Sequence, residues 1–319
     1  MWCVTERTFP LPVEEALRGF SADRFSGASS MLEAASAAFS ALSAHSAAKD
    51  GTAFISELED LSLALIDAQP MMAPIYNLCA SVLHDSQPSC MSLAKLKKSA
   101  LQTSDQYSRA AEAGLEKACM AASKLVLDGS KILTLSSSRA VIRSVELAKK
   151  DWKKFSVTVL ESRPMLEGRR AASALAAMGI PVELATDCSV ASEVKRADQI
   201  LIGADALTEE ALVNKMGTLA AAIIAQAASV PLLAVADSSK LLPHQILPES
   251  DRARNPNEVW ENAPLGVKVR NLYFERVPLK YIKTVTMEDG AVSPRDIVQK
   301  LENRGPGLAA LAKLLRREK

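Results

Sequence analysis

The feature that most constrains this chain is a change in the spacing of its apolar residues after Asp128-Gly129-Ser130. Beyond this point, short apolar runs rich in β-branched residues alternate with helical stretches. The runs are KILTL, SVTVLE, PVELA, QILIG and PLLAVA, and the stretches between them include AVIRSVELAKK, GRRAASALAAMG and NKMGTLAAAIIAQAA. This alternation predicts a parallel sheet covered on both faces, in a domain that we place at residues 129–319.

The first third of the chain has the spacing of helices instead. Apolar side chains recur at helical intervals over residues 29–48 and again in AFISELEDLSLALIDA, which Pro70 ends. A third helix is expected from about Met71 and a long one over residues 91–126, so residues 1–128 predict a helical bundle. Near the C-terminus, YIKTVT predicts one more strand, and Ser293-Pro294 predicts the start of a last helix.

Composition limits the possible partners. Lys and Arg total 38 against 37 Asp and Glu, which leaves no global field to attract nucleic acid or a membrane surface. Aromatic residues are 4% of the chain, too few for a base-stacking surface. Five cysteines without a CxxC pair, with three histidines, fit reduced thiols in a cytosol better than a disulfide framework or a zinc site.

The chain also lacks the usual targeting patterns. Its first residues carry charges where a signal peptide is apolar, and no apolar run is long enough to span a bilayer. We therefore expect a cytoplasmic protein that binds no metal, no cofactor, no membrane and no nucleic acid directly.

Polar residues follow the first two predicted strands. The first strand leads into Ser136, Ser137, Ser138 and Arg139, whose hydroxyls and guanidinium, beside the free amides of a helix start, suit a phosphate group. The alternative is a serine N-cap beside a surface arginine. The second strand leads into Glu161-Ser162-Arg163-Pro164, which fits either a ligand loop or a loop salt bridge.

Polar residues also follow the strands QILIG and PLLAVA. Asp205 comes just after the first, and Asn214 and Lys215 are expected near a later helix start, where an anion is favoured. Alternatively, Asp205 caps a helix and Lys215 is solvated. Lys240 follows the second strand, to meet a phosphate or to face water. Because ligands of open parallel sheets bind beyond the carboxyl ends of the strands, the four ends together predict one binding site.

Two nucleotide-binding motifs are absent. The chain has no GxxxxGK[ST] and no GxGxxG after a predicted strand. Binding of a phosphorylated small molecule therefore fits the predicted site better than nucleotide hydrolysis or hydride transfer does.

The segments ILTLSSSRAVIRSVELAKK, SVTVLESRPMLEGR, DCSVASEVKRADQILIGADAL, VNKMGT and VPLLAVADSSK resemble, in order and spacing, the alpha, beta and delta subunits of translation initiation factor 2B. That family includes isomerases of methylthioribose 1-phosphate and ribose 1,5-bisphosphate. SSSRAV is most similar to the alpha subunit, which has an arginine at that point. The resemblance runs from about residue 23 to TMEDGAVSP. It implies a helical N-terminal domain, a Rossmann-like C-terminal domain and assembly into dimers or larger oligomers.

The resemblance also implies catalytic positions. In the isomerases an aspartate and a cysteine carry the proton transfers. The aspartate matches Asp205, whereas the cysteine falls on Ser136. A thiol titrates near 8.5 and serves as a base near neutrality, but a hydroxyl needs a neighbouring base, for which His244 is the candidate that the fold could bring near.

Ligand positions carry over unevenly. The resemblance matches Gly27-Ala28, with Arg24 nearby, and Arg163, Asn214-Lys215 and Lys240 to ligand contacts. An arginine that the isomerases place before proline is replaced here by Gln69. Losing a bidentate phosphate contact is not a conservative change.

Three functions fit these observations. The first is a regulatory protein that binds a sugar phosphate or nucleotide and has a partner of the translation-factor type. The second is an aldose–ketose isomerase of a pentose phosphate, and the third an assembly subunit with a vestigial site. Ser136 and Gln69 favour the first, and Asp205 supports the second. Under each, we expect a homodimer or larger assembly built mainly through the C-terminal domain.

Overall fold

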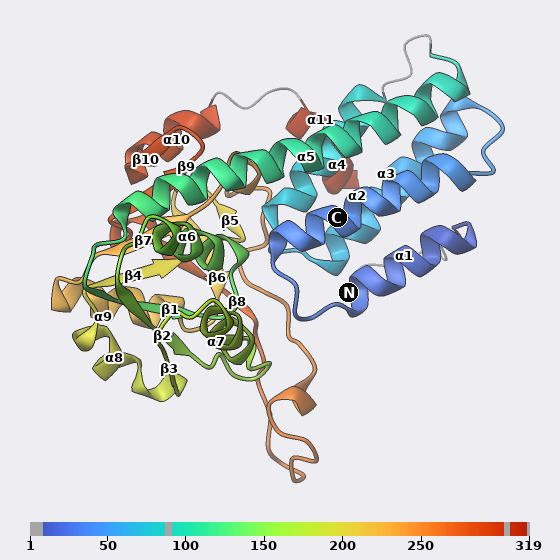
Figure 1. Cartoon of the computed structure of the whole chain (residues 1–319). Coiled ribbons are helices and arrows are strands. Elements are labelled where there is room, and N and C mark those ends of the chain that lie inside the picture. The colour runs from blue at the N-terminus through green and yellow to red at the C-terminus, as the bar shows by residue number, and fades with distance from the viewer. Residues whose placement is uncertain (1–8, 87–90, 303–306, 318–319) are drawn as a thin grey trace. The chain divides into compact units, whose positions relative to one another are not determined.

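The computed structural model describes residues 9–86, 91–302 and 307–317, which form two compact units (Figure 1). One unit contains the described residues of 1–112 and of 302–319, and the other contains residues 113–301. Cys3 and Cys90 lie outside the described residues, and Cys79, Cys119 and Cys188 are free thiols.

The first unit is helical. Its elements are α1 (Leu11–Ala22), α2 (Ala28–His45), α3 (Gly51–Ala68), α4 (Ala73–Asp85), the first part of α5 (Leu93–Leu125) and α11 (Gly307–Arg317). Helix α4 packs against α2, α3 and α11. The apolar faces expected from the sequence form this core: the side chains at the predicted spacing in α2 and α3 are all buried. Asp50 begins α3 by accepting a hydrogen bond from the Ala53 amide at 2.9 Å.

The second unit is built on a seven-stranded sheet. Its strands are β1 (Ser130–Leu135), β2 (Phe155–Leu160), β3 (Val182–Ala185), β4 (Gln199–Ile202), β7 (Leu232–Val235), β9 (Thr284–Met287) and β10 (Gly290–Val292). Their order is β10-β9-β7-β4-β1-β2-β3, and every pairing is parallel except that of β10 with β9. The six strands expected from the sequence are therefore present, and the predicted parallel sheet is confirmed.

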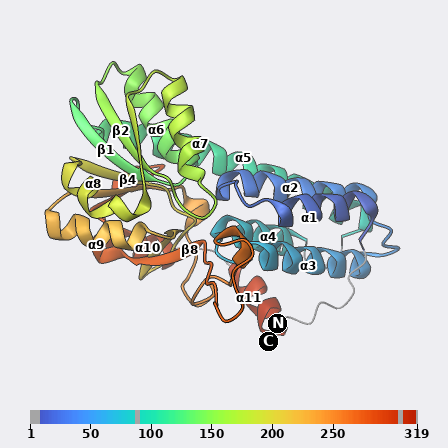
Figure 2. The same ribbon diagram turned by 90° about the horizontal axis from the view of Figure 1, so that it is seen from below.

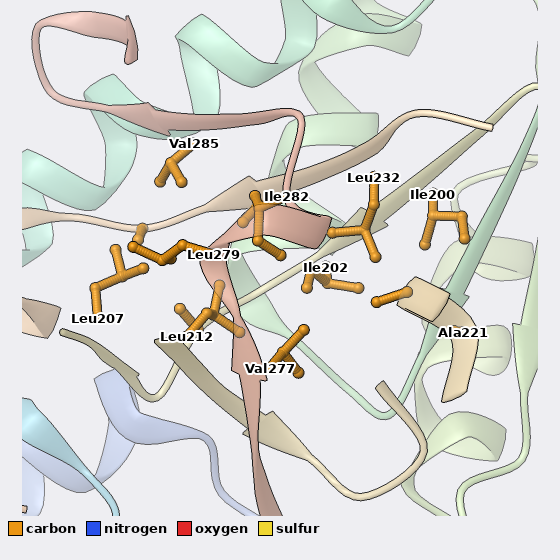
Figure 3. Close-up of a cluster of buried hydrophobic side chains, with 14 of the residues drawn as sticks. Ile200, Ile202, Leu207, Leu212, Ala221, Leu232, Val277, Leu279, Ile282 and Val285 are labelled. Atoms are coloured by element: carbon orange, nitrogen blue, oxygen red, sulfur yellow. The ribbon is translucent and has the colours of Figure 1, made fainter. Parts of the chain in front are cut away.

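Helices cover both faces of this sheet (Figure 2). One apolar cluster joins the last turns of α5 with α6 (Arg139–Lys150) and α7 (Glu167–Ala177). The opposite cluster joins α8 (Val190–Arg196), α9 (Thr218–Ala228) and α10 (Pro294–Glu302), and Figure 3 shows its centre. Along β4, Ile200 and Ile202 enter this second cluster while Leu201 enters the first. A strand buried on both faces explains why its sequence is continuously apolar.

A second, three-stranded sheet was not expected from the sequence. It consists of β5 (Ala206–Leu207), β6 (Ala211–Lys215) and β8 (Phe274–Pro278), paired antiparallel. Asn214 and Lys215 were expected in a helical stretch, near a helix start, but they end β6, and α9 begins only at Thr218. The strand forms because β8, some sixty residues later, supplies its hydrogen-bonding partner.

The two units divide the chain differently from the predicted domains at 1–128 and 129–319. The last part of α5, from Ala113, belongs to the sheet unit, where its apolar face covers one side of the sheet. Helix α11 belongs to the helical unit because it packs on α4. Two helices were absent from the expectation, α1 and α11.

Candidate functional site

The strand order creates a switch point between β1 and β4. From β1 the chain runs outward through β2 and β3, and it then returns to place β4 on the other side of β1. In open α/β sheets, ligands bind where the connections from two neighbouring strands leave in opposite directions. Ser136 follows β1 and Asp205 follows β4 closely, so the sequence-predicted residues stand at this point.

The loops after β1 and β4 are in direct contact at Gly203. A Cβ atom added to Gly203 would lie 2.3 Å from Ser138 Oγ, so a larger residue here would push the two loops apart. Ser138 also caps α6, because its Oγ accepts a hydrogen bond from the Val141 amide at 3.4 Å. The N-cap interpretation of this serine is therefore correct, and the capped helix start lies at the switch point.

Ser136 is held in a left-handed backbone conformation by the neighbouring strand end. Its φ is 62°, and its amide donates a hydrogen bond to Ser162 Oγ at 2.7 Å. Asp187 fixes Ser162 in turn, because its carboxylate accepts hydrogen bonds from the amides of Ser162 and Arg163 at 2.8 and 2.7 Å. The Ser162 hydroxyl thus joins the ends of β1 and β2, and Asp187, which sequence reasoning missed, holds Ser162 in place.

The Ser136 hydroxyl has no hydrogen-bonded base among the described residues. Within the described part of the chain, no hydrogen bond to its Oγ is formed. His244, the candidate partner, is directed elsewhere: its Nδ1 lies 3.4 Å from Glu209 Oε2, and its amide donates to the same oxygen. Nothing therefore activates this hydroxyl as a proton acceptor.

Lys240 is buried, contrary to the alternative that it faces water. It lies in a 3-10 turn, Ser238–Lys240, that follows β7, and its relative exposure is 3%. Over the residues that the structure describes, its Nζ makes no hydrogen bond and has no carboxylate oxygen within 4.0 Å. A buried ammonium without a close partner is costly, and a bound anion would offset that cost.

Three charged groups influence Lys240. Burial lowers its pKa below the usual 10.5, the nearby carboxylates of Asp237 and Asp205 oppose this shift, and Arg139 adds to it. Lys240, Asp205 and Arg139, from the ends of three neighbouring strands, are therefore close enough to interact electrostatically. Asp205 is 9% exposed, and its amide donates to the Val213 carbonyl at 2.9 Å, which places Asp205 beside Asn214 on β6.

Lys215 differs from Lys240 in having a partner. It is buried, its ammonium forms an ion pair with Glu167 at the start of α7, and the ring centroid of Tyr273 lies 4.4 Å from its Nζ. Its charge is therefore already compensated within the protein. Lys215 is thus not the solvated lysine of the alternative, and it needs no bound anion to balance its charge. Glu167 and Tyr273 lie far from Lys215 in the sequence, and no pattern in it indicated them.

The start of α9 also holds an internal anion. Glu275 Oε1 accepts hydrogen bonds from the amides of Gly217 and Leu219 at 2.6 and 3.0 Å. A carboxylate of β8 thus occupies the helix start that the sequence analysis expected an anionic ligand to use. Asn214 donates from its Nδ2 to Thr218 Oγ1 at 3.1 Å and is buried.

The remaining predicted contacts are more dispersed. Arg163 is exposed, and its Nη2 donates to the Val259 carbonyl at 2.8 Å. Arg24, Gly27 and Ala28 belong to the helical unit, where Gly27 precedes α2, so their part in the site stays a prediction. Gln69 is buried in that unit and donates to the Asp23 carbonyl at 3.3 Å.

Two further features are absent from the described residues. No helix there is both long and apolar enough to cross a membrane. No three His, Cys, Asp or Glu side chains in the same residues are placed to hold a metal ion.

The sheet order and the polar switch point define a Rossmann-like α/β protein with an additional helical unit. More particularly, the chain belongs to the initiation factor 2 subunit family, whose model matches residues 24–294.

Individual relatives fall into two groups. Ribose 1,5-bisphosphate isomerase of Methanocaldococcus jannaschii is 30% identical over 250 residues, covering 76% of this chain and 79% of the relative. The putative translation initiation factor eIF-2B subunit 2-like of Pyrococcus abyssi is 31% identical over 295 residues, covering 90% of this chain and 99% of the relative. The crystal structure of translation initiation factor eIF-2B from Pyrococcus horikoshii matches with a TM-score of 0.79 and 26% identity, covering 91% of this chain and all of that one. The predicted family is confirmed, and the closer match to the alpha subunit stays a prediction.

Proposed function

We propose that this chain is a regulatory protein that binds a small phosphorylated ligand, a sugar phosphate or a nucleotide, at the carboxyl edge of its parallel sheet. The observation that carries this proposal is Lys240, a buried ammonium without a hydrogen bond or a carboxylate within 4.0 Å among the described residues. A phosphate at the ends of β1, β4 and β7 would supply the direct ion pair that Lys240 lacks. Ser137, Ser138 and Arg139, at the start of α6, stand at the same edge.

A role in binding rather than turnover is supported by Ser136. Proton transfer between sugar carbons needs a group that is ionised near neutrality, and a hydroxyl without a neighbouring base is not. The second candidate is an aldose–ketose isomerase of ribose 1,5-bisphosphate or methylthioribose 1-phosphate. Asp205 favours it, because a largely buried carboxylate at a switch point is placed to exchange a proton with a ligand.

Replacing Lys240 tests the proposal. We expect Lys240→Met to weaken the binding of ribose 1,5-bisphosphate about 10- to 100-fold, since a charge-assisted hydrogen bond is lost. Calorimetric titration measures this, with Lys283→Met as the matched control because Lys283 is exposed. Equal affinity in wild type and Lys240→Met would show that the phosphate binds elsewhere.

The same titrations should depend on pH. The lowered pKa of Lys240 means that the ammonium loses its proton at a lower pH than an ordinary lysine. Affinity is then full below that pKa and falls as pH rises through it. Lys240→Met should lack this alkaline decrease, so its persistence in the variant would contradict the assignment.

We also propose a homodimer or larger assembly, formed through the sheet unit, and a cytoplasmic location. A protein partner of the translation-factor type fits the relatives with initiation-factor names. Light scattering at micromolar concentration should give a mass at least twice the 34.2 kDa of one chain, and the monomer mass would contradict the assembly.

A further inference from the structure

The turn that carries Lys240 is held by two carboxylates. Asp237 accepts a hydrogen bond from the Ser239 amide at 2.9 Å, inside the turn. Glu288 approaches from outside: its Oε1 accepts from both the amide and the hydroxyl of Ser238, each at 2.7 Å. Glu288 thus fixes the first residue of the turn whose last residue is Lys240.

The sheet explains why Glu288 is available. β9 pairs with β7, and the Ala236 amide donates to the Thr286 carbonyl at 3.0 Å just beyond the end of β7. The hairpin from β9 to β10 follows immediately, and Glu288 is its first residue. The carboxylate is therefore brought to Ser238 by rigid backbone pairing rather than by a flexible loop.

Helix α5 approaches Glu288 closely. A Cβ atom added to Gly114 would lie 2.6 Å from Glu288 Oε1 and 3.1 Å from its Cγ, so only glycine leaves this room. Gly114 lies in the middle of a helix, where glycine is unfavourable relative to alanine. Helix α5 also continues through the division between the two units, which falls after Glu112.

We propose that Glu288 positions Lys240 for the phosphorylated ligand, and that its contact with α5 at Gly114 makes this positioning depend on where α5 lies on the sheet. The inference rests on the proposed function. Without the Glu288 acceptor, the amide and hydroxyl of Ser238 lose a charge-assisted partner and the turn loosens. The ammonium is then free to leave its buried position, although no atom of Glu288 needs to touch the ligand.

Removing the carboxylate is the first arm of the test. We expect Glu288→Ala to weaken the binding of ribose 1,5-bisphosphate about tenfold in calorimetric titrations, on the order of one charge-assisted hydrogen bond. Glu288→Gln keeps an oxygen acceptor and should restore most of the affinity. Asp289→Ala is the matched control, because Asp289 pairs with Lys300 and not with the turn.

Crowding the carboxylate is the second arm. Gly114→Ala should displace the Glu288 side chain and weaken binding several-fold, on the order of a neutral hydrogen bond. In the Glu288→Ala background, where the carboxylate is gone, the same substitution should have no further effect. Gly19→Ala is the matched control, because Gly19 lies in helix α1 with nothing within 4 Å of an added Cβ.

Two readouts separate positioning from general destabilisation. Hydrogen exchange of residues 237–241 should quicken in Glu288→Ala and Gly114→Ala but not in Glu288→Gln. The alkaline decrease in affinity should also move to higher pH in Glu288→Ala, because a more solvated Lys240 approaches its usual pKa while Asp237, Asp205 and Arg139 remain.

The outcomes distinguish this inference from the proposed function. Suppose that Lys240→Met loses affinity, but Glu288→Ala and Gly114→Ala have the ligand affinity and the hydrogen-exchange rates of wild type. The positioning role of Glu288 is then wrong, while the proposed binding function is supported. If Gly114→Ala and Glu288→Ala weaken binding additively in the double variant, Gly114 does not act through Glu288, and the proposed role of the α5 contact is wrong. If wild type binds no ribose 1,5-bisphosphate, or Lys240→Met binds it equally well, both are overturned, because Glu288 then has nothing to position.

Discussion

Lys215→Met is expected to lower the free energy of unfolding by about 3–5 kcal/mol, the usual cost of removing one member of a buried ion pair. The substitution leaves the Glu167 carboxylate buried without its cation. Glu167 Oε2 is already without a hydrogen-bond partner among the described residues, so nothing in its present contacts compensates. Urea denaturation of wild type and variant measures the difference.

Two further variants identify the cause. Lys215→Met with Glu167→Gln should recover much of the stability, since no uncompensated charge then remains. Lys150→Met, which breaks the exposed pair of Lys150 with Glu146, should cost at most about 1 kcal/mol. A Lys215→Met protein as stable as wild type, but unable to bind ribose 1,5-bisphosphate, would instead make Lys215 a ligand contact.

Ser136→Cys is expected to raise isomerase activity on ribose 1,5-bisphosphate by about 10²–10⁴ over a wild type that turns over slowly or not at all. Conversion of ribose 1,5-bisphosphate to the ketose moves a proton from C2 to C1, breaks the bond between C1 and the ring oxygen, and passes the proton of the 2-hydroxyl to that oxygen. Atoms therefore balance without a co-reactant. A thiol with a pKa near 8.5 can take part near neutrality, whereas the unassisted Ser136 hydroxyl cannot.

The carboxylate should be needed for any such activity. Asp205→Asn should abolish turnover in the Ser136→Cys protein while leaving binding largely intact, because an amide keeps the shape but cannot exchange a proton. Ser137→Cys serves as the matched control for an added thiol. Ketose formation followed with time measures each variant. Brisk turnover by wild type, unchanged by Ser136→Cys, would place the isomerase candidate ahead of the binding one.

Local patterns were enough for the parts of the fold that local chemistry decides. The apolar run of β4 predicted a strand because both of its faces are buried. Ser138, which precedes a helical pattern, caps α6 as its residue type favours. The polar residues at the strand ends could also be read in order along the chain. The switch point between β1 and β4 could not, because it depends on how distant strands pair.

Contacts between distant segments could not be predicted in this way. Lys215 and Lys240 look alike in sequence, as lysines after apolar runs. Among the described residues, however, Lys215 forms an ion pair with a carboxylate within 4.0 Å and Lys240 does not. The difference arises because Glu167, 48 residues away, begins α7 at the same edge. Asn214 and Lys215, the last residues of β6, were placed in a helical stretch for a similar reason: the strand that pairs with them, β8, lies far along the chain.

A crystal structure of the protein soaked with ribose 1,5-bisphosphate would locate the bound ligand directly. The proposal predicts a phosphate group within hydrogen-bonding distance of Lys240 Nζ, at the ends of β1 and β4, with the sugar unconverted. A ligand bound away from this edge at saturating concentration would contradict the site. A ketose in the density would contradict the assignment of binding without turnover.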